Sequence, residues 1–297
     1  MIINTILKAT NAGKAQNTVK AFSHRLTQLS RKADLTKPEE VKTAIANATN
    51  EKTAKPLNNS TKSSLCLAYE WFCKTNNLQW EKPKYKWEEG TPIIPTTEQV
   101  TKIISATTKR FATIYTIMVE TGIEGEELHR LHKNQIDTER GIISIKGTKG
   151  HNSGTYKLKN QTAEMLREYL GKDQREYPFP QPKVMSEQWR TARDRLADNL
   201  KQPDLKKIPM KNLRNYSGAK LYYSLPLPDP IAVMRHLRHK KLETTMHYLR
   251  AIITITETDI EYTAKATNNK EEALKLIEAG YQYMTDIDGF KLFRKRK

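Results

Sequence analysis

The chain contains only two cysteines, Cys66 and Cys73, among its 297 residues. Two cysteines cannot build a disulfide framework, and their spacing does not match a zinc site. Seven positions separate them, which places both on one face of a helix beside Tyr69. We therefore predict two buried thiols in a packed apolar stripe.

Long apolar runs are also missing. No run approaches the roughly 20 residues that a membrane-spanning helix needs. The first residues, MIINTILKATNAGKAQ, have a short apolar stretch without a basic segment or a cleavage signal. We therefore expect a soluble, cytoplasmic protein without a membrane partner.

Acidic residues are scarce relative to basic ones. The chain has 33 Asp and Glu against 51 Lys and Arg, a formal net charge of +18. Such an excess opposes compaction, so it favours a polyanionic partner such as DNA or RNA over a merely solvated surface. The excess is concentrated in residues 201–250, which contain eleven basic residues and only three acidic ones, Asp204, Asp229 and Glu243. This concentration favours a nucleic-acid footprint.

The length suits two domains rather than one core. Apolar residues at helical spacing predict helices over residues 17–31, 38–49 and 59–77, so residues 1–80 are expected to form a helical DNA-binding domain. Residues 81–95, rich in Pro, Lys and Glu, are expected to be a linker.

The second half is expected to be mixed. A helix should open at Thr96 with Gln99 as its capping partner, and another should end at Gly122. Residues 141–159 predict a hairpin, and residues 263–297 a small βαββ appendage whose last two strands join at a tight turn at Asp288-Gly289. The expected fold class is mainly α with small β elements (α+β), with residues 96–262 as the catalytic domain.

Cutting DNA without a metal requires three kinds of group. A nucleophile attacks the phosphodiester, cations surround the transition state, and an acid protonates the departing 5′ oxygen. Arginine suits the second task because its planar guanidinium pairs with phosphate oxygens. Lysine or histidine suits the third, and a tyrosine among cations can be the nucleophile.

The sequence supplies these groups in order. The segment KNLRNYSGAKLYY holds Lys211 and Arg214, and LRHKKLETTMHYL holds His239 and Tyr248. The hairpin adds two lysines, Lys146 and Lys149.

These segments resemble the boxes of a known family. VETGIEGEELHRLHKNQID, KGTKGHNSGTYKL, KNLRNYSGAKLYY and LRHKKLETTMHYL resemble, in order, the boxes of the tyrosine recombinases, the phage-integrase superfamily. The C-terminal EEALKLIEAGYQYMTDIDGFKLFRKRK resembles the tail of archaeal members. The resemblance covers residues 96–297, and the helical N-terminal domain more loosely.

The resemblance implies a role for each matching residue. Tyr248 would attack the scissile phosphate and form a 3′-phosphotyrosyl bond. Arg214 would hold a non-bridging oxygen, and His239 matches the histidine of the "LGH" box. Lys149 would protonate the leaving oxygen, with Lys146 as the competing choice.

The resemblance also implies the surroundings of these residues. Lys211 stands where many members carry histidine, and Arg238, in place of the usual glycine, would contact DNA together with Lys240 and Lys241. The expected partner is double-stranded DNA at attachment sites, bound by a tetramer in the cytoplasm at the nucleoid. No cofactor or metal is expected. Delivery of Tyr248 in cis or in trans stays open.

One position departs from the family. The box usually reads Thr-Gly-x-Arg, but here Glu124 follows Thr121, Gly122 and Ile123. Three interpretations stay open: an inactivating change, natural or engineered; replacement by Arg130, which points about 120° away on a helix; or a carboxylate that turns aside to pair with a lysine. The expected function is a site-specific recombinase weakened at Glu124, and the alternative is a non-catalytic DNA-binding protein on the same fold.

Overall fold

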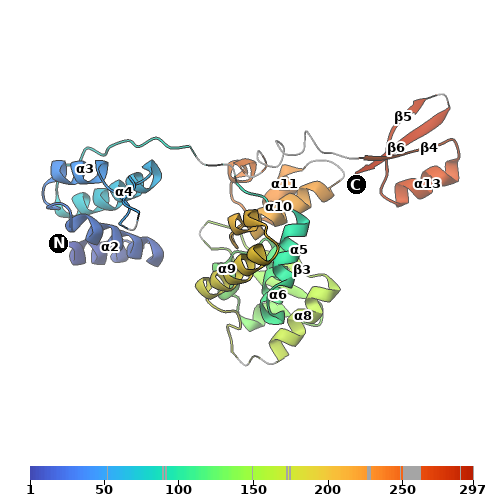
Figure 1. Ribbon diagram of the computed structural model, residues 1–297. Coiled ribbons are helices and arrows are strands. Elements are labelled where there is room, and N and C mark those ends of the chain that lie inside the picture. The colour runs from blue at the N-terminus through green and yellow to red at the C-terminus, as the bar shows by residue number, and fades with distance from the viewer. Residues whose placement is uncertain are drawn as a thin grey trace. The chain divides into compact units, whose positions relative to one another are not determined.

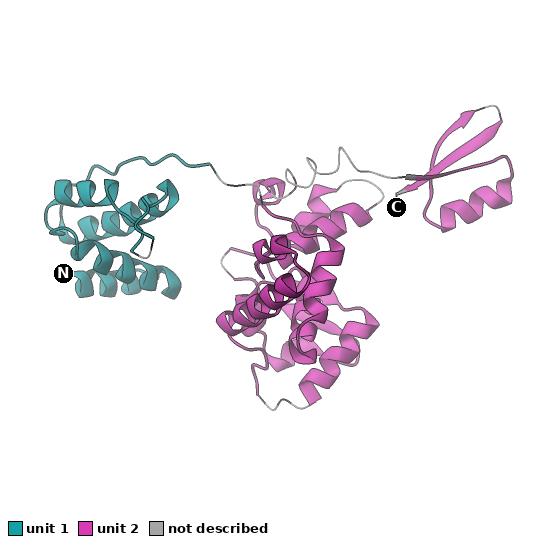
Figure 2. Cartoon of the chain, in the orientation of Figure 1, with its two compact units in different colours: residues 1–90 teal, residues 91–297 magenta. Residues whose placement is uncertain are grey.

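The computed structural model describes residues 1–51, 53–88, 90, 92–148, 150–171, 173, 175–225, 229–247, 249, 262–287 and 289–296. The chain forms two compact units, Met1–Gly90 and Thr91–Lys297 (Figure 2). In the described part, no helix combines the length and the apolar content that crossing a bilayer requires.

Unit 1 is built from helices (Figure 1). They are α1 (Ile2–Asn11), α2 (Gln16–Ser30), α3 (Pro38–Ala46) and α4 (Asn59–Asn76). The last three confirm the helices expected from the apolar spacing, whereas α1 was not predicted. Cys66 and Cys73 are buried in the core of this unit beside Tyr69, which confirms the predicted stripe.

Two aromatic residues, one at the end of the expected helical domain and one within the expected linker, pack on the core of unit 1. Trp80 meets Tyr69 edge-on, with 4.7 Å between ring centroids, and Tyr85 packs against the same core. Burial of these two aromatic rings carries the unit beyond residue 80, because large apolar side chains gain most by leaving water.

Unit 2 starts with the helices that build its core. They are α5 (Thr97–Ser105), α6 (Lys109–Thr121), α7 (Gly125–His129), α8 (Asn160–Gly171) and α9 (Pro182–Asn199), with the short 3-10 turns η1 (Lys133–Gln135) and η2 (Pro203–Lys207). The expected capping box at the start of α5 is confirmed: Gln99 N donates to Thr96 Oγ1 (3.2 Å), and Thr96 N donates to Gln99 Oε1 (2.9 Å).

Two aromatic residues fix α6 against α9. Tyr115 and Trp189 are fully buried and meet edge-on, with 4.9 Å between centroids. Each also satisfies its polar atom, since Tyr115 OH donates to Met185 O (2.7 Å) and Trp189 Nε1 donates to Ile208 O (2.8 Å). Hydrogen-bonded aromatic pairs of this kind set a rigid base for the elements above them.

The predicted hairpin is confirmed within a small antiparallel sheet. Its strands are β1 (Ile136–Asp137), β2 (Ile142–Ile145) and β3 (Gly154–Lys157), in the order β1-β2-β3. Ile145 pairs with Gly154, so the chain between these two residues forms the hairpin tip. The tip carries Lys146, one of the two candidate acids.

Two helices complete the arrangement around this tip: α10 (Asn212–Ser224) and α11 (Pro230–His236). Gly218 lets them approach closely, because a Cβ there would come within 2.8 Å of Leu237 Cδ1. The contact brings the segment after α11 next to Arg214 on α10.

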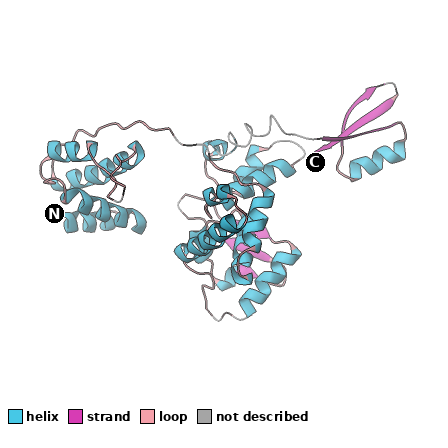
Figure 3. Cartoon of the chain, in the orientation of Figure 1, coloured by secondary structure: helices cyan, strands magenta, loops and turns pink. Residues whose placement is uncertain are grey.

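The C-terminal residues form the predicted βαββ motif (Figure 3). Its elements are β4 (Tyr262–Thr267), α13 (Lys270–Glu278), β5 (Gln282–Ile287) and β6 (Phe290–Arg296), with the sheet order β4-β6-β5. Gly289 adopts φ 79° between β5 and β6, as the expected tight turn requires. Phe293 is buried beneath α13 with Leu276.

Candidate active site

The site begins where α6 ends. Gly122 closes this helix at φ 61°, and a Cβ at this position would come within 2.7 Å of Leu237 Cδ2. Only glycine combines the left-handed backbone with so close a neighbour. The turn releases the carbonyl of Gly122 toward α10 and places Glu124 directly before α7.

Arg214 is held at the centre of the site. It is 6% exposed, its Nη1 donates to the carbonyl of Gly122, and its Nη2 donates to the carbonyl of Leu237. The guanidinium therefore joins the end of α6 to the segment after α11, with its orientation fixed from two sides. This rigidity is what a phosphate-binding arginine requires.

Glu124 faces this arginine. Its Oε1 lies 3.8 Å from Arg214 Nε and 3.9 Å from His151 Nε2, and its side chain is 35% exposed. The carboxylate thus lies between the guanidinium and solvent. Among the described residues, the charged partners of Glu124 are Arg214 and His151, and the alternative in which it pairs with a lysine stays a prediction. Arg130 is also committed elsewhere, because its Nη2 pairs with Glu126 at 2.6 Å.

Glu127 is the buried anion beneath the site. Its side chain has no exposed surface, yet it remains a carboxylate. Burial raises its pKa, but the hydrogen bonds from His151 and the Glu124 backbone and the charge of Arg238 together lower the pKa to about 2. Its Oε1 lies 3.0 Å from His151 Nδ1, and its Oε2 lies 2.7 Å from Arg238 Nη2.

Arg238 lies inside the domain. It is 2% exposed, and its Nη1 donates to Thr121 O (3.1 Å) and Tyr156 OH (2.6 Å). Its charge is already paired with Glu127, and both side chains are almost completely buried, so the expected DNA contact of Arg238 does not fit its position. It joins α6, β3 and Glu127 instead.

His239 is also buried, at 3% exposure. Its Nδ1 lies 2.9 Å from Thr245 Oγ1, and its ring centroid is 6.0 Å from that of His151. Burial, followed by the charges of Arg214, His151 and Arg238, lowers its pKa to about 3. A neutral His239 follows at neutral pH.

Most of the remaining candidates lie on the surface. Lys211, directly before α10, and Lys146, directly after β2, are exposed, as are Lys240 and Lys241. Tyr248 and Lys149 lie outside the described residues, so their predicted roles stay predictions.

The side chains that surround Arg214 form one cluster with it: Glu124, Glu127, His151, Tyr156, Arg238 and His239. Sequence reasoning missed three of its members, Glu127, His151 and Tyr156. Each lies in a segment that resembles a family box, so the resemblance indicated the segment but not the residue. Tyr156 donates to the carbonyl of His236, and burial raises its pKa. In the cluster, two guanidinium groups face two carboxylates, so these four charges cancel.

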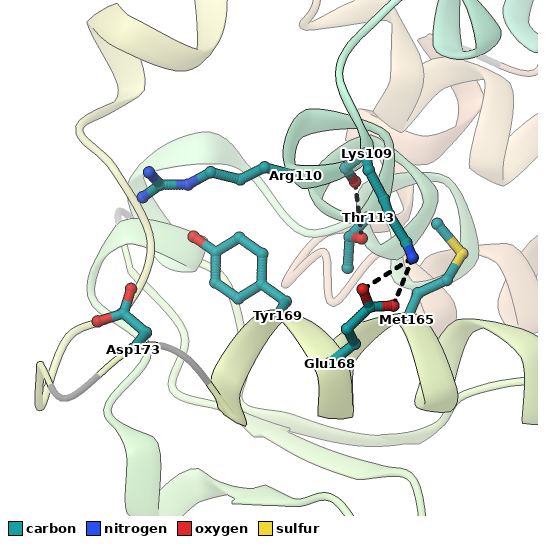
Figure 4. A pocket seen from close by; sticks show the side chains of 7 residues that line it. All are labelled: Lys109, Arg110, Thr113, Met165, Glu168, Tyr169 and Asp173. Carbon is teal, nitrogen blue, oxygen red and sulfur yellow. Dashed lines mark hydrogen bonds and ion pairs between the residues drawn. The ribbon is translucent and has the colours of Figure 1, made fainter.

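A separate cavity of about 240 Å³ lies between α6 and α8 (Figure 4). Lys109 pairs across it with Glu168 at 2.6 Å, and the guanidinium of Arg110 lies 5.6 Å from the Tyr169 ring centroid. None of the residues around Arg214 lines this cavity, in which Lys109 pairs with Glu168, whereas Asp173 pairs with Arg175 outside the lining.

The chain is similar to known proteins. The profile of the phage integrase family matches residues 95–252, more than half of the chain. The tyrosine recombinase XerA of Thermococcus kodakarensis is 28% identical over 204 residues, covering 65% of this chain and 66% of its own length. A probable integrase/recombinase protein of Methanocaldococcus jannaschii is 28% identical over 156 residues, covering 48% and 46%. The matches thus span about two thirds and about half of these archaeal relatives.

Solved structures share the fold. A lambda integrase dimer bound to a COC′ core site matches with a TM-score of 0.62 at 12% identity, covering 83% of this chain and 75% of that one. The Tn1549 transposon integrase in complex with transposon right end DNA matches with a TM-score of 0.57 at 12% identity, covering 86% and 98%. These likenesses confirm the expected fold class, and the profile match shows that the chain belongs to the phage integrase family, the tyrosine recombinases.

Proposed function

We propose that this protein is a site-specific DNA recombinase that cuts and rejoins DNA through a 3′-phosphotyrosyl intermediate, and that Glu124 strongly weakens its cleavage step. The observation that carries the proposal is the cluster itself. Arg214 is buried and fixed in the family's box position, and a carboxylate lies 3.8 Å from its Nε.

In this reaction the phenol of Tyr248 loses its proton to solvent, and its oxygen attacks the scissile phosphorus and forms a phosphodiester with the 3′ end as the bond to the 5′ oxygen breaks. The 5′ oxygen leaves and takes a proton from Lys149 or Lys146. Arg214 binds a non-bridging oxygen, and His239 donates a hydrogen bond to the phosphate. Reversal by an incoming 5′ hydroxyl rejoins the strand without loss of the bond.

Glu124 acts against this reaction in three ways. Its negative charge repels the phosphate, and the repulsion is stronger in a water-poor site than in bulk solvent. It also replaces a bidentate donor, and loss of one such transition-state contact costs about 10² to 10³ in rate by analogy with oxyanion-hole deletions. The carboxylate further competes with the phosphate for Arg214.

Double-stranded DNA is the proposed partner. The net charge of +18 and the exposed Lys211, Lys240 and Lys241 support it, because basic surfaces bind phosphate backbones by counterion release. The DNA complexes of the lambda and Tn1549 integrases point the same way. We further propose that the active assembly is a tetramer on attachment-site DNA.

A non-catalytic DNA-binding protein is the second candidate. The observation that favours it is the charge balance of the cluster, in which Glu124 and Glu127 offset Arg214 and Arg238. A site without net positive charge attracts phosphate weakly. The fold would then serve DNA binding alone.

A covalent-adduct assay separates the two candidates. Nicked duplexes that tile the DNA flanking the gene are incubated with the protein, and adducts are resolved on a denaturing gel. We expect duplex binding and a slow adduct that disappears in Tyr248→Phe while binding is unchanged. Binding without any adduct, even after long incubation, supports the non-catalytic candidate. An adduct that survives Tyr248→Phe would place the nucleophile elsewhere.

A further inference from the structure

Arg238 has an unusual backbone conformation for its residue type. Its φ is 60°, in the left-handed region where glycine is favoured and where side chains are strained. The family box carries glycine at this position. Its side chain also passes close to β3, because a Cβ on Gly154 would lie 3.1 Å from Arg238 Cδ. Some interaction must therefore hold an arginine here against the strain.

The ion pair with Glu127 is that interaction. Arg238 Nη2 lies 2.7 Å from Glu127 Oε2, and both side chains are almost completely buried, at 2% and 0% exposure. Arg238 Nε, in contrast, is buried without a hydrogen-bond partner among the described residues. The guanidinium is thus positioned by Thr121, Tyr156 and Glu127, of which Glu127 is the charged partner.

Glu127 has a strong need for this partner. A buried carboxylate is tolerated only when it is paired and hydrogen-bonded. Its Oε1 is 3.0 Å from His151 Nδ1, and its Oε2 also accepts from the backbone N of Glu124 at 3.0 Å. Arg238 is the guanidinium in this set.

The same carboxylate is within reach of position 124. The imidazole of His151 separates the two carboxylates, with Glu124 3.9 Å from Nε2 and Glu127 3.0 Å from Nδ1. An arginine side chain is longer than glutamate, so an arginine at position 124 would extend to Glu127 across or beside this ring.

We propose that the residues at positions 124 and 238 depend on each other. Arg238 is a positioning residue: from the segment after α11 it supplies the guanidinium that Glu127 would otherwise bind from an arginine at position 124. The inference rests on the proposed function. It follows that an arginine placed at 124 meets Arg238 already bonded to Glu127. Two guanidinium groups then compete for one carboxylate, so the new side chain is held less firmly against the phosphate.

The stability of unit 2 tests the coupling without any cleavage. The full chain is unfolded in urea and labelled by pulsed hydrogen exchange, and mass spectrometry of α6 and α10 peptides gives the urea midpoint. The set is the unmodified chain, Glu124→Arg, Arg238→Gly and the double variant. In the unmodified chain, we expect Arg238→Gly to lower the urea midpoint strongly. In the Glu124→Arg background it should lower the midpoint by roughly half as much or less, because the arginine at 124 can then pair with Glu127 instead.

Arg193 provides the matched control. It is also a buried arginine of unit 2, 9% exposed, but it bonds Asp194 and the carbonyl of Ile208. Arg193→Met should lower the midpoint equally in both backgrounds. Equal losses for Arg238→Gly in both backgrounds would overturn the coupling. If Arg238→Gly alone does not fold, a folded double variant supports the proposal, and failure of both contradicts it.

Adduct formation on the nicked duplex gives a second readout. Added to Glu124→Arg, Arg238→Gly should raise the adduct rate about tenfold, a part of the 10² to 10³ that one transition-state donor contributes. Added to the unmodified chain, which keeps Glu124, it should give no gain. A gain from Glu124→Arg to which Arg238→Gly adds nothing would overturn the coupling and leave the proposed function standing. No adduct from any variant would refute the proposed function, and the stability set would still decide the coupling.

Discussion

The buried His239 and the half-buried His236 make the stability of unit 2 depend on pH. His239 is 3% exposed, and burial together with the charges of Arg214 and His151 lowers its pKa to about 3. His236 lies against Ser217, with Nε2 2.8 Å from Oγ, and burial followed by Arg238 and Arg214 lowers its pKa to about 4. Both imidazoles are therefore neutral in the folded protein well below neutral pH.

The sign of the effect follows from proton binding. Between the folded pKa values and the ordinary histidine pKa of about 6.5, the unfolded chain binds more protons than the folded one. The stabilisation is fully present above pH 6.5 and is lost as the pH falls toward 4 and then 3. From pH 7.5 to 5.5, each histidine should reduce the free energy of unfolding by about 1.3 kcal/mol, so the pair by about 2 to 3 kcal/mol.

Pulsed hydrogen exchange in urea measures this loss separately for each unit. Samples are equilibrated at pH 7.5 and 5.5 and labelled at one common pH. Peptides of α6 and α10 should show a lower urea midpoint at pH 5.5. Unit 1 is an internal control, because its only histidine, His24, is exposed.

Variants identify the groups responsible. His236→Asn and His239→Asn should each remove about half of the pH-dependent loss, whatever their effect at pH 7.5, because asparagine does not titrate. A loss of the same size in the double variant would refute the assignment to these histidines. An unchanged midpoint between pH 7.5 and 5.5 in the unmodified chain would show that they are not buried as neutral groups.

Further predictions concern the core of unit 1 and the DNA interface. Phe72→Ala removes a fully buried ring of unit 1 and should lower its free energy of unfolding by about 3 to 5 kcal/mol in urea titration; a loss below about 1 kcal/mol would mean that the site is not packed as described. The double change Lys240→Gln and Lys241→Gln should weaken duplex binding and reduce the slope of log affinity against log salt by about 2, and an unchanged slope would exclude both lysines from the interface. Residues 92–297 alone should bind duplex DNA more weakly and with a shallower salt slope than the full chain, and equal slopes would remove unit 1 from the interface.

Local signals in the sequence were sufficient for much of the fold. The capping box of Thr96 and Gln99, the left-handed stop at Gly122 and the turn at Gly289 each depend on a few neighbouring residues. The buried stripe of Cys66 and Cys73 depends on helical spacing alone. Such features are set by backbone geometry and can be recognised without tertiary contacts.

Side-chain partners far apart in the chain were not predictable in the same way. Arg238 and Glu127 are 111 positions apart, and nothing local indicates that a charged residue in a basic segment turns inward to a buried carboxylate. The sequence pattern indicated the lysines near His151 as site residues and not His151 itself, although its ring lies between Glu124 and Glu127. The family boxes indicated which segments meet, but the pairing inside the site depends on packing directions that only the fold sets.

The most direct measurement of the central claim is the adduct rate of Glu124→Arg beside the unmodified chain, on the same nicked duplex. If Glu124 blocks the phosphate site, Glu124→Arg should raise the rate by about 10²-fold, within the effect of one transition-state donor. Duplex affinity should stay nearly unchanged, and adding Tyr248→Phe should abolish the adduct. A fast adduct from the unmodified chain, or no gain from Glu124→Arg, would contradict the account.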